Sequence, residues 1–192
     1  MNIRSYIFTT GDRESVNNVK DCLQSTMSWI AYFTPGKEVF WRGFNILFLD
    51  AEYTNAELYI FTPDDFIDID LDRIKEIHNE YKHEPYVYNI INDGRSGQWT
   101  GIQERVIDEH TIMCGFTDCG FFCNREALES IGFYVTDPKK KDGSSGVGQQ
   151  LSMRFMLKRI VMYKPVKSLA THGDHESIMH PEERKQNPLI SI

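Results

Sequence analysis

The sequence Glu-Leu-Tyr-Ile-Phe-Thr-Pro-Asp-Asp occupies residues 57–65 of this 192-residue chain. Its first six residues are rich in aromatic and branched side chains, which is typical of a buried β-strand. The strand passes through Pro63 directly into two adjacent carboxylates, Asp64 and Asp65. In open α/β sheets, ligands bind at the carboxyl ends of the strands. We therefore expect a functional site at this point of the chain.

Helical patterns lie on both sides of this strand. A helix is favoured over residues 44–54, although residues 46–49 alone would also suit a strand. On the other side, Asp68 or Asp70 can cap a second helix. The apolar residues at helical spacing are Phe44, Leu47, Phe48 and Ala51 in the first helix, and Leu71, Ile74, Ile77 and Tyr81 in the second.

Strands alternate with helices through the first half of the chain, and the second half is more mixed. This order is typical of an α/β fold with an open sheet flanked by helices. We expect one domain over residues 1–180 and a tail, or a linker into further domains of a longer chain, over residues 181–192. The other expected strands are residues 5–10, 29–33, 86–91, a segment near 111–123, 160–163 and 166–170. Three further helices are expected: one with Val16, Val19, Cys22 and Leu23 on one face, one over residues 125–131 that ends before Gly132, and one over residues 149–158.

The net charge of −7 argues against a surface for nucleic acid or anionic membrane. A phosphate-bearing ligand would then need a few placed cations, backbone N–H groups or a metal. No apolar run approaches the roughly 20 residues of a transmembrane helix, and the N-terminus is too polar for a signal peptide. We therefore expect a cytoplasmic protein with reduced cysteines. Cys114, Cys119 and Cys123 lack Cys-x-x-Cys spacing, which favours buried thiols over a zinc site.

The acidic pair has two interpretations. In a crevice, Asp64 and Asp65 would repel each other unless a cation neutralised them, which favours a metal site. A solvated turn or a helix cap is the alternative, because Asp is common in both. The apolar strand just before the pair favours the metal. Asp68 and Asp70 have the spacing Asp-x-Asp, but they lie further from the strand end and helix capping explains them.

A second group of metal-capable residues is Thr-His-Gly-Asp-His-Glu-Ser at residues 171–177. His172 and His175 are candidate ligands, and a structural role for each is equally open. A site that mixes carboxylate and imidazole suits a transition metal or a tolerant Mg²⁺/Mn²⁺ site.

The order of these motifs resembles that of glycosyltransferases with the GT-A fold. Residues 9–13 (Thr-Thr-Gly-Asp-Arg) are similar to the end of their nucleotide-binding first strand, and residues 44–65 resemble their helix, strand and acidic motif. Residues 118–132 are similar to their donor- and acceptor-sugar segment, and residues 172–177 resemble a turn that completes the metal site. The resemblance spans residues 5–180 and extends to the small glycosyltransferase domains of large DNA viruses such as chlorella viruses.

This resemblance implies an open, mostly parallel mixed sheet with a Rossmann-like nucleotide-binding half. It implies transfer of a sugar from a nucleotide-diphosphate sugar, with UDP-sugars favoured, to a glycan or another hydroxyl acceptor. Mn²⁺ or Mg²⁺ would stabilise the charge of the departing diphosphate. The implied roles are metal binding by Asp65 with Asp64, His172 and His175, contacts to the base or ribose by Thr9 and Thr10, extra cations from Arg13 and Arg42, and hydrogen bonds from the sugar to Asp118.

One position departs from the family pattern. Inverting members often carry a Glu-Asp pair where this chain has Gln149-Gln150, and an amide cannot accept a proton from an acceptor hydroxyl at neutral pH. Asp142 or Asp118 would then supply the base, or the enzyme would retain configuration, or the domain would be catalytically weak. These alternatives stay open.

Three other functions fit parts of the pattern. A sugar nucleotidyltransferase uses a similar sheet and metal, but it would need a Gly-rich phosphate loop, and residues 9–13 offer one glycine. A metal-dependent hydrolase would be built around the histidine segment and would hydrolyse nucleotide sugars without an acceptor. A non-catalytic sugar-binding module would bind glycans without metal or nucleotide.

Overall fold

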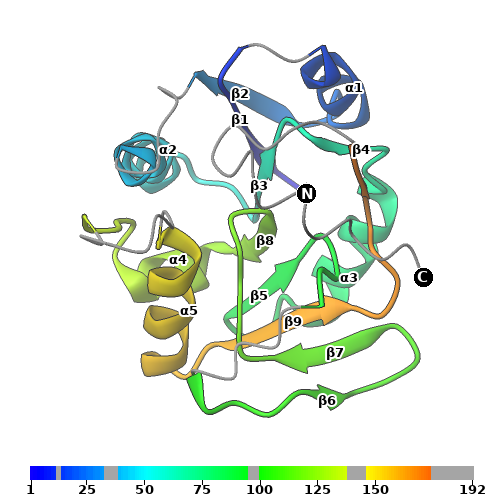
Figure 1. The fold of residues 1–192 in the computed structure, drawn as a ribbon, viewed down its shortest axis with the longest axis vertical. Helices are drawn as coiled ribbons and strands as arrows, with labels where there is room; N and C mark the ends of the chain where they lie inside the picture. Colours follow the sequence, from blue (N-terminus) through cyan, green and yellow to red (C-terminus); the bar gives the residue numbers. More distant parts are fainter. Residues whose placement is uncertain (12–13, 33–38, 95–99, 138–145, 174–192) are drawn as a thin grey trace, which may run out of the picture.

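The computed structural model describes residues 1–11, 14–32, 39–94, 100–137 and 146–173, in which eight strands form one mixed sheet with helices on both faces (Figure 1). The strand order in the sheet is β2-β1-β3-β8-β5-β9-β7-β6, and β10 and β4 form a second, two-stranded sheet. The strands are β1 (Ile3–Thr9), β2 (Met27–Tyr32), β3 (Leu58–Pro63), β4 (Phe66–Ile67), β5 (Tyr86–Asn89), β6 (Arg105–Val106), β7 (Thr111–Cys114), β8 (Phe121–Asn124), β9 (Val161–Pro165) and β10 (Thr171–His172), and the helices are α1 (Ser15–Cys22), α2 (Phe40–Tyr53), α3 (Leu71–Tyr81), α4 (Arg125–Ile131) and α5 (Val147–Leu157).

The N-terminal half has a Rossmann-like order. β1 pairs in parallel with β2 on one side and with β3 on the other. The chain therefore moves outward from β1 through α1 to β2, and then returns through α2 to β3. This reversal creates a topological switch point between β1 and β3, where open α/β sheets bind ligands.

The sheet as a whole is mixed but mostly parallel in strand direction, as predicted. β8 is antiparallel to both β3 and β5, and β7 is antiparallel to both β9 and β6, whereas β5 and β9 are parallel. Of the eight strands in this sheet, only β7 and β8 therefore run against the others. The result confirms the predicted open α/β fold.

Helices cover both faces of the sheet. Figure 1 shows α1 and α3 on one face and α2, α4 and α5 on the other. The face under α2 is rich in aromatic rings: Phe61 of β3 stacks on Tyr6 at 4.9 Å and on Phe121 at 4.8 Å, and Phe44 and Phe48 of α2 pack against it. These buried rings explain why the residues at helical spacing in 44–54 form a helix rather than a strand.

Two predicted strands are wrong. The segment near 111–123 forms two strands, β7 and β8, because residues 115–120 cross the ends of β9 and β5, which lie between them in the sheet. Residues 166–170 form no strand. Their backbone bonds the ends of neighbouring elements instead: the Leu169 N–H donates to the Ile90 carbonyl, and the Leu169 carbonyl accepts from the Asp70 N–H. The short strands β4 and β6 were not predicted.

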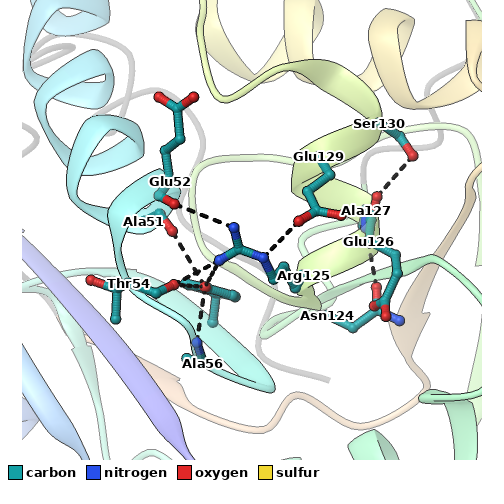
Figure 2. Close-up of polar contacts among 11 residues, drawn as sticks. Ala51, Glu52, Thr54, Ala56, Asn124, Arg125, Glu126, Ala127, Glu129 and Ser130 are labelled. Atoms are coloured by element: carbon teal, nitrogen blue, oxygen red, sulfur yellow. Dashed lines mark hydrogen bonds and ion pairs between the residues drawn. The ribbon is translucent and has the colours of Figure 1, made fainter.

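The amino edge of the sheet, defined here as the edge where β3 begins and β8 ends, is held by Arg125. Its guanidinium donates to the carbonyls of Thr54 and Glu52, to the Tyr59 hydroxyl and to the Glu129 carboxylate (Figure 2). The Tyr59 hydroxyl in turn donates to the Thr54 carbonyl. This network joins the C-terminal end of α2 to β3 and α4, and it satisfies carbonyls that the helix end leaves unpaired.

None of the described helices has the length and apolar character needed to cross a bilayer.

Candidate functional site

The carboxyl edge of the sheet, defined here as the opposite edge where β1 and β3 end, carries the first part of the site. The Thr9 hydroxyl donates to Asp64 Oδ2 at 2.5 Å, so the two strand ends are joined across the switch point. The same Thr9 oxygen accepts from the Gly11 N–H, and the Asp64 N–H donates to the Phe8 carbonyl. Asp64 is only 4% exposed, which is rare for a carboxylate without a function or a partner.

The second part of the site is the small sheet formed by β4 and β10. β4 follows the acidic pair directly, and its antiparallel pairing places His172 opposite Phe66. The Gly173 N–H then donates to the Asp65 carbonyl at 2.7 Å. This pairing brings Asp65 Oδ2 to 3.8 Å from His172 Nε2, although the two residues are more than a hundred positions apart in the sequence.

The orientation of the His172 ring follows from its other nitrogen. Nδ1 lies 3.0 Å from the Gly173 carbonyl, and because a carbonyl can only accept, the proton is on Nδ1. Nε2, the nitrogen on the side of Asp65, is then the one left to bind a cation or to carry a second proton. Metal-binding histidines commonly donate their second N–H to a backbone carbonyl in this way.

The Asp65–His172 pair fits a shared cation. Two ligands of one Mg²⁺ or Mn²⁺ lie about 3–4 Å apart, since each bond is about 2.1 Å long. Among the described residues, no group of three or more His, Cys, Asp or Glu is gathered for a metal. Mg²⁺ usually takes one or two protein carboxylates together with substrate phosphates and water, so a small protein donor set is compatible with it. A protonated His172 paired with Asp65 is the alternative for this geometry.

Phe66 links the acidic pair to the segment that contains Asp118. A Cβ atom on Gly120 would lie 2.2 Å from the Phe66 ring, so only glycine allows the ring to approach this backbone. The other side of the contact is His172, whose ring centroid lies 5.5 Å from that of Phe66. Gly120 and His172 therefore pack against the same buried ring.

Asp118 lies at the N-terminus of α5. Its Oδ1 would be 3.1 Å from a Cβ on Gly148, in the first turn of that helix. A carboxylate is favourable here because the helix dipole is positive at its N-terminus. The side chain is half-buried, and the structure therefore holds it at the carboxyl edge in a defined place.

Three buried polar side-chain atoms in the described part of the chain lie near this edge of the sheet and have no hydrogen-bond partner. Among the described residues, the buried side-chain atoms without a hydrogen-bond partner are Thr10 Oγ1, Ser15 Oγ and Trp41 Nε1. Thr10 directly follows β1, and Ser15 and Trp41 lie in the first turns of α1 and α2, which start from this edge. Buried polar atoms are normally paired, so their gathering beside the switch point is consistent with a ligand that completes them.

The remaining predicted residues divide into two groups. Arg42 is exposed in the first turn of α2, with its guanidinium 5.4 Å from the Trp41 ring centroid, and the structure does not bring it to the acidic pair. Arg13, Asp142 and His175 lie outside the described residues, as does the predicted tail at 181–192.

Gln150 has a structural role that explains its amide. Its Oε1 accepts from the N–H and hydroxyl of Thr136, and its Nε2 donates to the Thr136 carbonyl. A carboxylate could not donate to that carbonyl. The amide at this position therefore clamps a backbone segment to α5.

The contacts of Asp70 decide one alternative from the sequence, and the cysteines have buried surroundings in three of four cases. Asp70 Oδ1 accepts from the Arg73 N–H at 2.9 Å and caps α3, so the Asp-x-Asp spacing belongs to a helix cap, as predicted. All four cysteines are free thiols. Burial raises the pKa of the Cys114 thiol to about 11, and it raises that of Cys123 as well, so both stay protonated as small buried side chains.

Sequence reasoning missed Phe66, Gly120 and Asn89. Asn89 is a buried amide at the end of β5 that bonds residues 116–118. Gly120 directly precedes an apolar strand, and a glycine at such a position can indicate that another group approaches the backbone closely. The contacts of Asn89 and Phe66 are long-range in sequence, and no local pattern marks them.

No protein-family model matches this chain, and no curated protein matches it in sequence. Among solved structures, the chain is similar to the crystal structure of A197 from STIV, with a TM-score of 0.57 and 16% sequence identity. The match covers 91% of this chain and 87% of that chain. At this identity the similarity supports the fold alone.

Proposed function

We propose that this protein is a metal-dependent glycosyltransferase that uses a nucleotide-diphosphate sugar, with UDP-sugars favoured, and a glycan or other hydroxyl acceptor. The observation that supports the proposal best is the meeting of Thr9, Asp64, Asp65 and His172 at the switch point of a Rossmann-like half-sheet. This is the place where such sheets bind nucleotides. The proposal also agrees with the GT-A-like order of motifs in the sequence.

Asp64 and Asp65 have different roles in this proposal. Asp65 and His172 would hold Mn²⁺ or Mg²⁺, which when bound supplies Lewis-acid stabilisation to a departing diphosphate. Asp64 accepts from Thr9 and thereby fixes the strand end from which Asp65 projects. The buried hydroxyl of Thr10 and the indole N–H of Trp41 are available to donate to the nucleotide.

Asp118 would act on the sugar. Its carboxylate stands at the N-terminus of α5, next to the segment that packs on Phe66, and it can accept hydrogen bonds from sugar hydroxyls. Asp118 is also the candidate base within the described residues, because Gln150 is committed to Thr136.

We also propose the cytoplasm as the compartment, or the host cytoplasm if the protein is viral. The four free thiols are consistent with a reducing environment.

The test is a thermal-shift screen of UDP-sugars and other nucleotide sugars with and without Mn²⁺. A ligand that binds the native state alone stabilises it by about 2.7 kcal/mol at 100 times its dissociation constant, so the correct donor should raise the melting temperature clearly. We expect the shift to require metal and nucleotide together. Stabilisation by free glycans, with no response to either component, would favour the sugar-binding module.

A product assay with the best donor then separates the enzymatic alternatives. Transfer of the sugar to an added acceptor, faster than its release to water, is the expected result. Hydrolysis that no acceptor suppresses would favour the hydrolase. Formation of a nucleotide sugar from a sugar phosphate and a nucleoside triphosphate would favour the nucleotidyltransferase.

A further inference from the structure

A buried polar network lies between β5, β9 and α5, away from the acidic pair. Its members are Asn89, Thr117 and Ser152, which are 7%, 0% and 0% exposed. Burying polar side chains is unfavourable unless each of their hydrogen bonds is made. Apolar side chains in the same space would carry no such requirement. The placement of this network therefore calls for an explanation.

Both the nitrogen and the oxygen of the Asn89 side-chain amide are hydrogen-bonded. Nδ2 donates to the carbonyls of Phe116 at 2.9 Å and Tyr163 at 3.1 Å. Oδ1 accepts from the Thr117 hydroxyl at 2.9 Å and from the Asp118 N–H at 3.3 Å. One side chain at the end of β5 thus fixes three consecutive residues, 116–118, against β9.

Ser152 holds the same segment from the side of α5. Its Oγ accepts from the Thr117 N–H at 2.8 Å, and it lies 2.7 Å from the Gly148 carbonyl and 3.1 Å from that of Thr117. Gly148 belongs to the helical turn over which the Asp118 carboxylate lies. The two side chains therefore set the segment relative to the helix N-terminus as well as to the sheet.

The fixed segment ends in the candidate sugar-binding carboxylate. Residues 116–118 are bonded on both sides, and Gly120 is pressed against Phe66 beside His172. The position of Asp118 relative to the Asp65–His172 pair is thus determined by buried contacts and not by the surface. These bonds are made to the backbone of residues 116–118 and to the Thr117 hydroxyl, so they set the point of the chain from which the Asp118 side chain projects.

We propose that Asn89 is a positioning residue that sets the Asp118 carboxylate for its contact with the transferred sugar. The inference deepens the proposed glycosyltransferase function and rests on it for the identity of the ligand. Asn89 touches neither nucleotide nor metal in this proposal and acts only through the segment 116–118.

The experiment compares Asn89→Ala with Asn124→Ala in the full chain. Asn124 is a matched control because it is a buried asparagine, 2% exposed, that bonds Glu84 and Ala127 at the amino edge. For Asn89→Ala we expect kcat for sugar transfer to fall at least about tenfold, because a misplacement of about 1 Å can lower a rate by up to about 10²-fold. Affinity for UDP with Mn²⁺, measured by calorimetry, should stay within about twofold in both variants. Asn124→Ala should keep kcat.

A double mutant separates positioning from general loosening. In an Asp118→Ala background, Asn89→Ala should change kcat less than about twofold, because the group it positions is gone. A further tenfold loss would overturn the proposal, as would an equal loss of kcat in Asn124→Ala. If Asn89→Ala does not fold, Thr117→Val removes the hydroxyl bond to Asn89 with little change in shape and should give the same pattern at a smaller amplitude.

The result remains decisive if the protein transfers no sugar. Absence of transfer with every nucleotide sugar would contradict the proposed function, and the positioning role is then judged from crystal structures. Asn89→Ala should move the Asp118 carboxylate by about 1 Å or more, whereas Asn124→Ala should not. An unmoved carboxylate would overturn the inference independently of any activity.

Discussion

At the amino edge of the sheet, Arg125 lies among the carbonyls of Thr54 and Glu52 and the carboxylate of Glu129, so this polar cluster contains its own cation (Figure 2). At the carboxyl edge, the adjacent carboxylates of Asp64 and Asp65 are buried; the Thr9 hydroxyl donates to Asp64, and the His172 imidazole lies 3.8 Å from Asp65. The amino edge balances its charges and bonds within the protein. The carboxyl edge instead places two buried aspartates after β3, and the buried Thr10 hydroxyl that follows β1 has no hydrogen-bond partner among the described residues.

The comparison shows that acidic residues at strand ends are not by themselves evidence of a site. Glu129 and Asp70 are carboxylates beside strand or helix ends, and both are explained by an ion pair or a cap. Asp64 and Asp65 differ because they are about 95% buried at a topological switch point. We therefore expect substitutions at the carboxyl edge to change activity, and those at the amino edge to change stability.

The largest expected effect is at the carboxyl edge. Asp65→Asn keeps the size of the side chain but removes its charge, and it should lower metal-dependent turnover by at least about 10²-fold, or about 2.7 kcal/mol of barrier. Initial rates at saturating Mn²⁺ measure this loss, and circular dichroism checks that the fold persists. Near-native turnover in this variant would contradict the expectation that the carboxyl edge is the site of activity.

At the amino edge, Arg125→Met should be mainly a stability mutant. It keeps the aliphatic stem but removes a guanidinium bonded to two carbonyls and a hydroxyl, and it should destabilise the fold by about 2 kcal/mol with turnover unchanged. Urea unfolding measures the change. Arg73→Met is the control, because its ion pair with Glu76 is exposed and should matter by less than about 0.5 kcal/mol.

His172→Ala should weaken Mn²⁺ binding by about tenfold, or about 1.4 kcal/mol, because one ligand of the proposed site is lost. Isothermal calorimetry with Mn²⁺ and UDP measures the affinity. His83→Ala, which removes an exposed histidine just before β5 at the amino edge, should leave it unchanged. Equal affinity in wild type and His172→Ala would favour the alternative of a simple His172–Asp65 ion pair.

The smallest effect concerns His78, a buried histidine whose Nδ1 lies 2.9 Å from the Tyr86 hydroxyl. Burial, assisted by nearby Lys82, lowers the pKa of His78 below its usual value. Below about pH 6.5, His78 is therefore protonated in the unfolded chain more readily than in the folded protein. The free energy of unfolding decreases as the pH falls through this range.

This pH dependence can be assigned by substitution. Between about pH 7.5 and pH 5.5, wild type should lose about 1 kcal/mol more stability than His78→Gln, which does not titrate in this range. Urea unfolding at the two pH values measures the difference. Parallel losses in both proteins would assign the pH dependence to other groups.

Much of the fold could be predicted from local patterns. The helix α4 and its glycine stop were predicted with correct bounds, since Gly132 adopts the left-handed conformation that ends a helix. The helix α2 and the strand β3 were recognised from spacing and composition. Residues 111–123 and 166–170 were predicted wrongly because apolar composition cannot tell where a chain leaves one strand and crosses the ends of others.

The sequence by itself determined the α/β alternation, the strand that ends in Asp64-Asp65 and the cap at Asp70, because each depends on residues within a few positions of one another. Only the tertiary structure decided that Thr9 meets Asp64, that His172 meets Asp65 and that Asn89 holds the Asp118 segment. Each of these contacts joins strand ends that are brought together by the order of strands in the sheet, and that order is fixed by packing of the whole core.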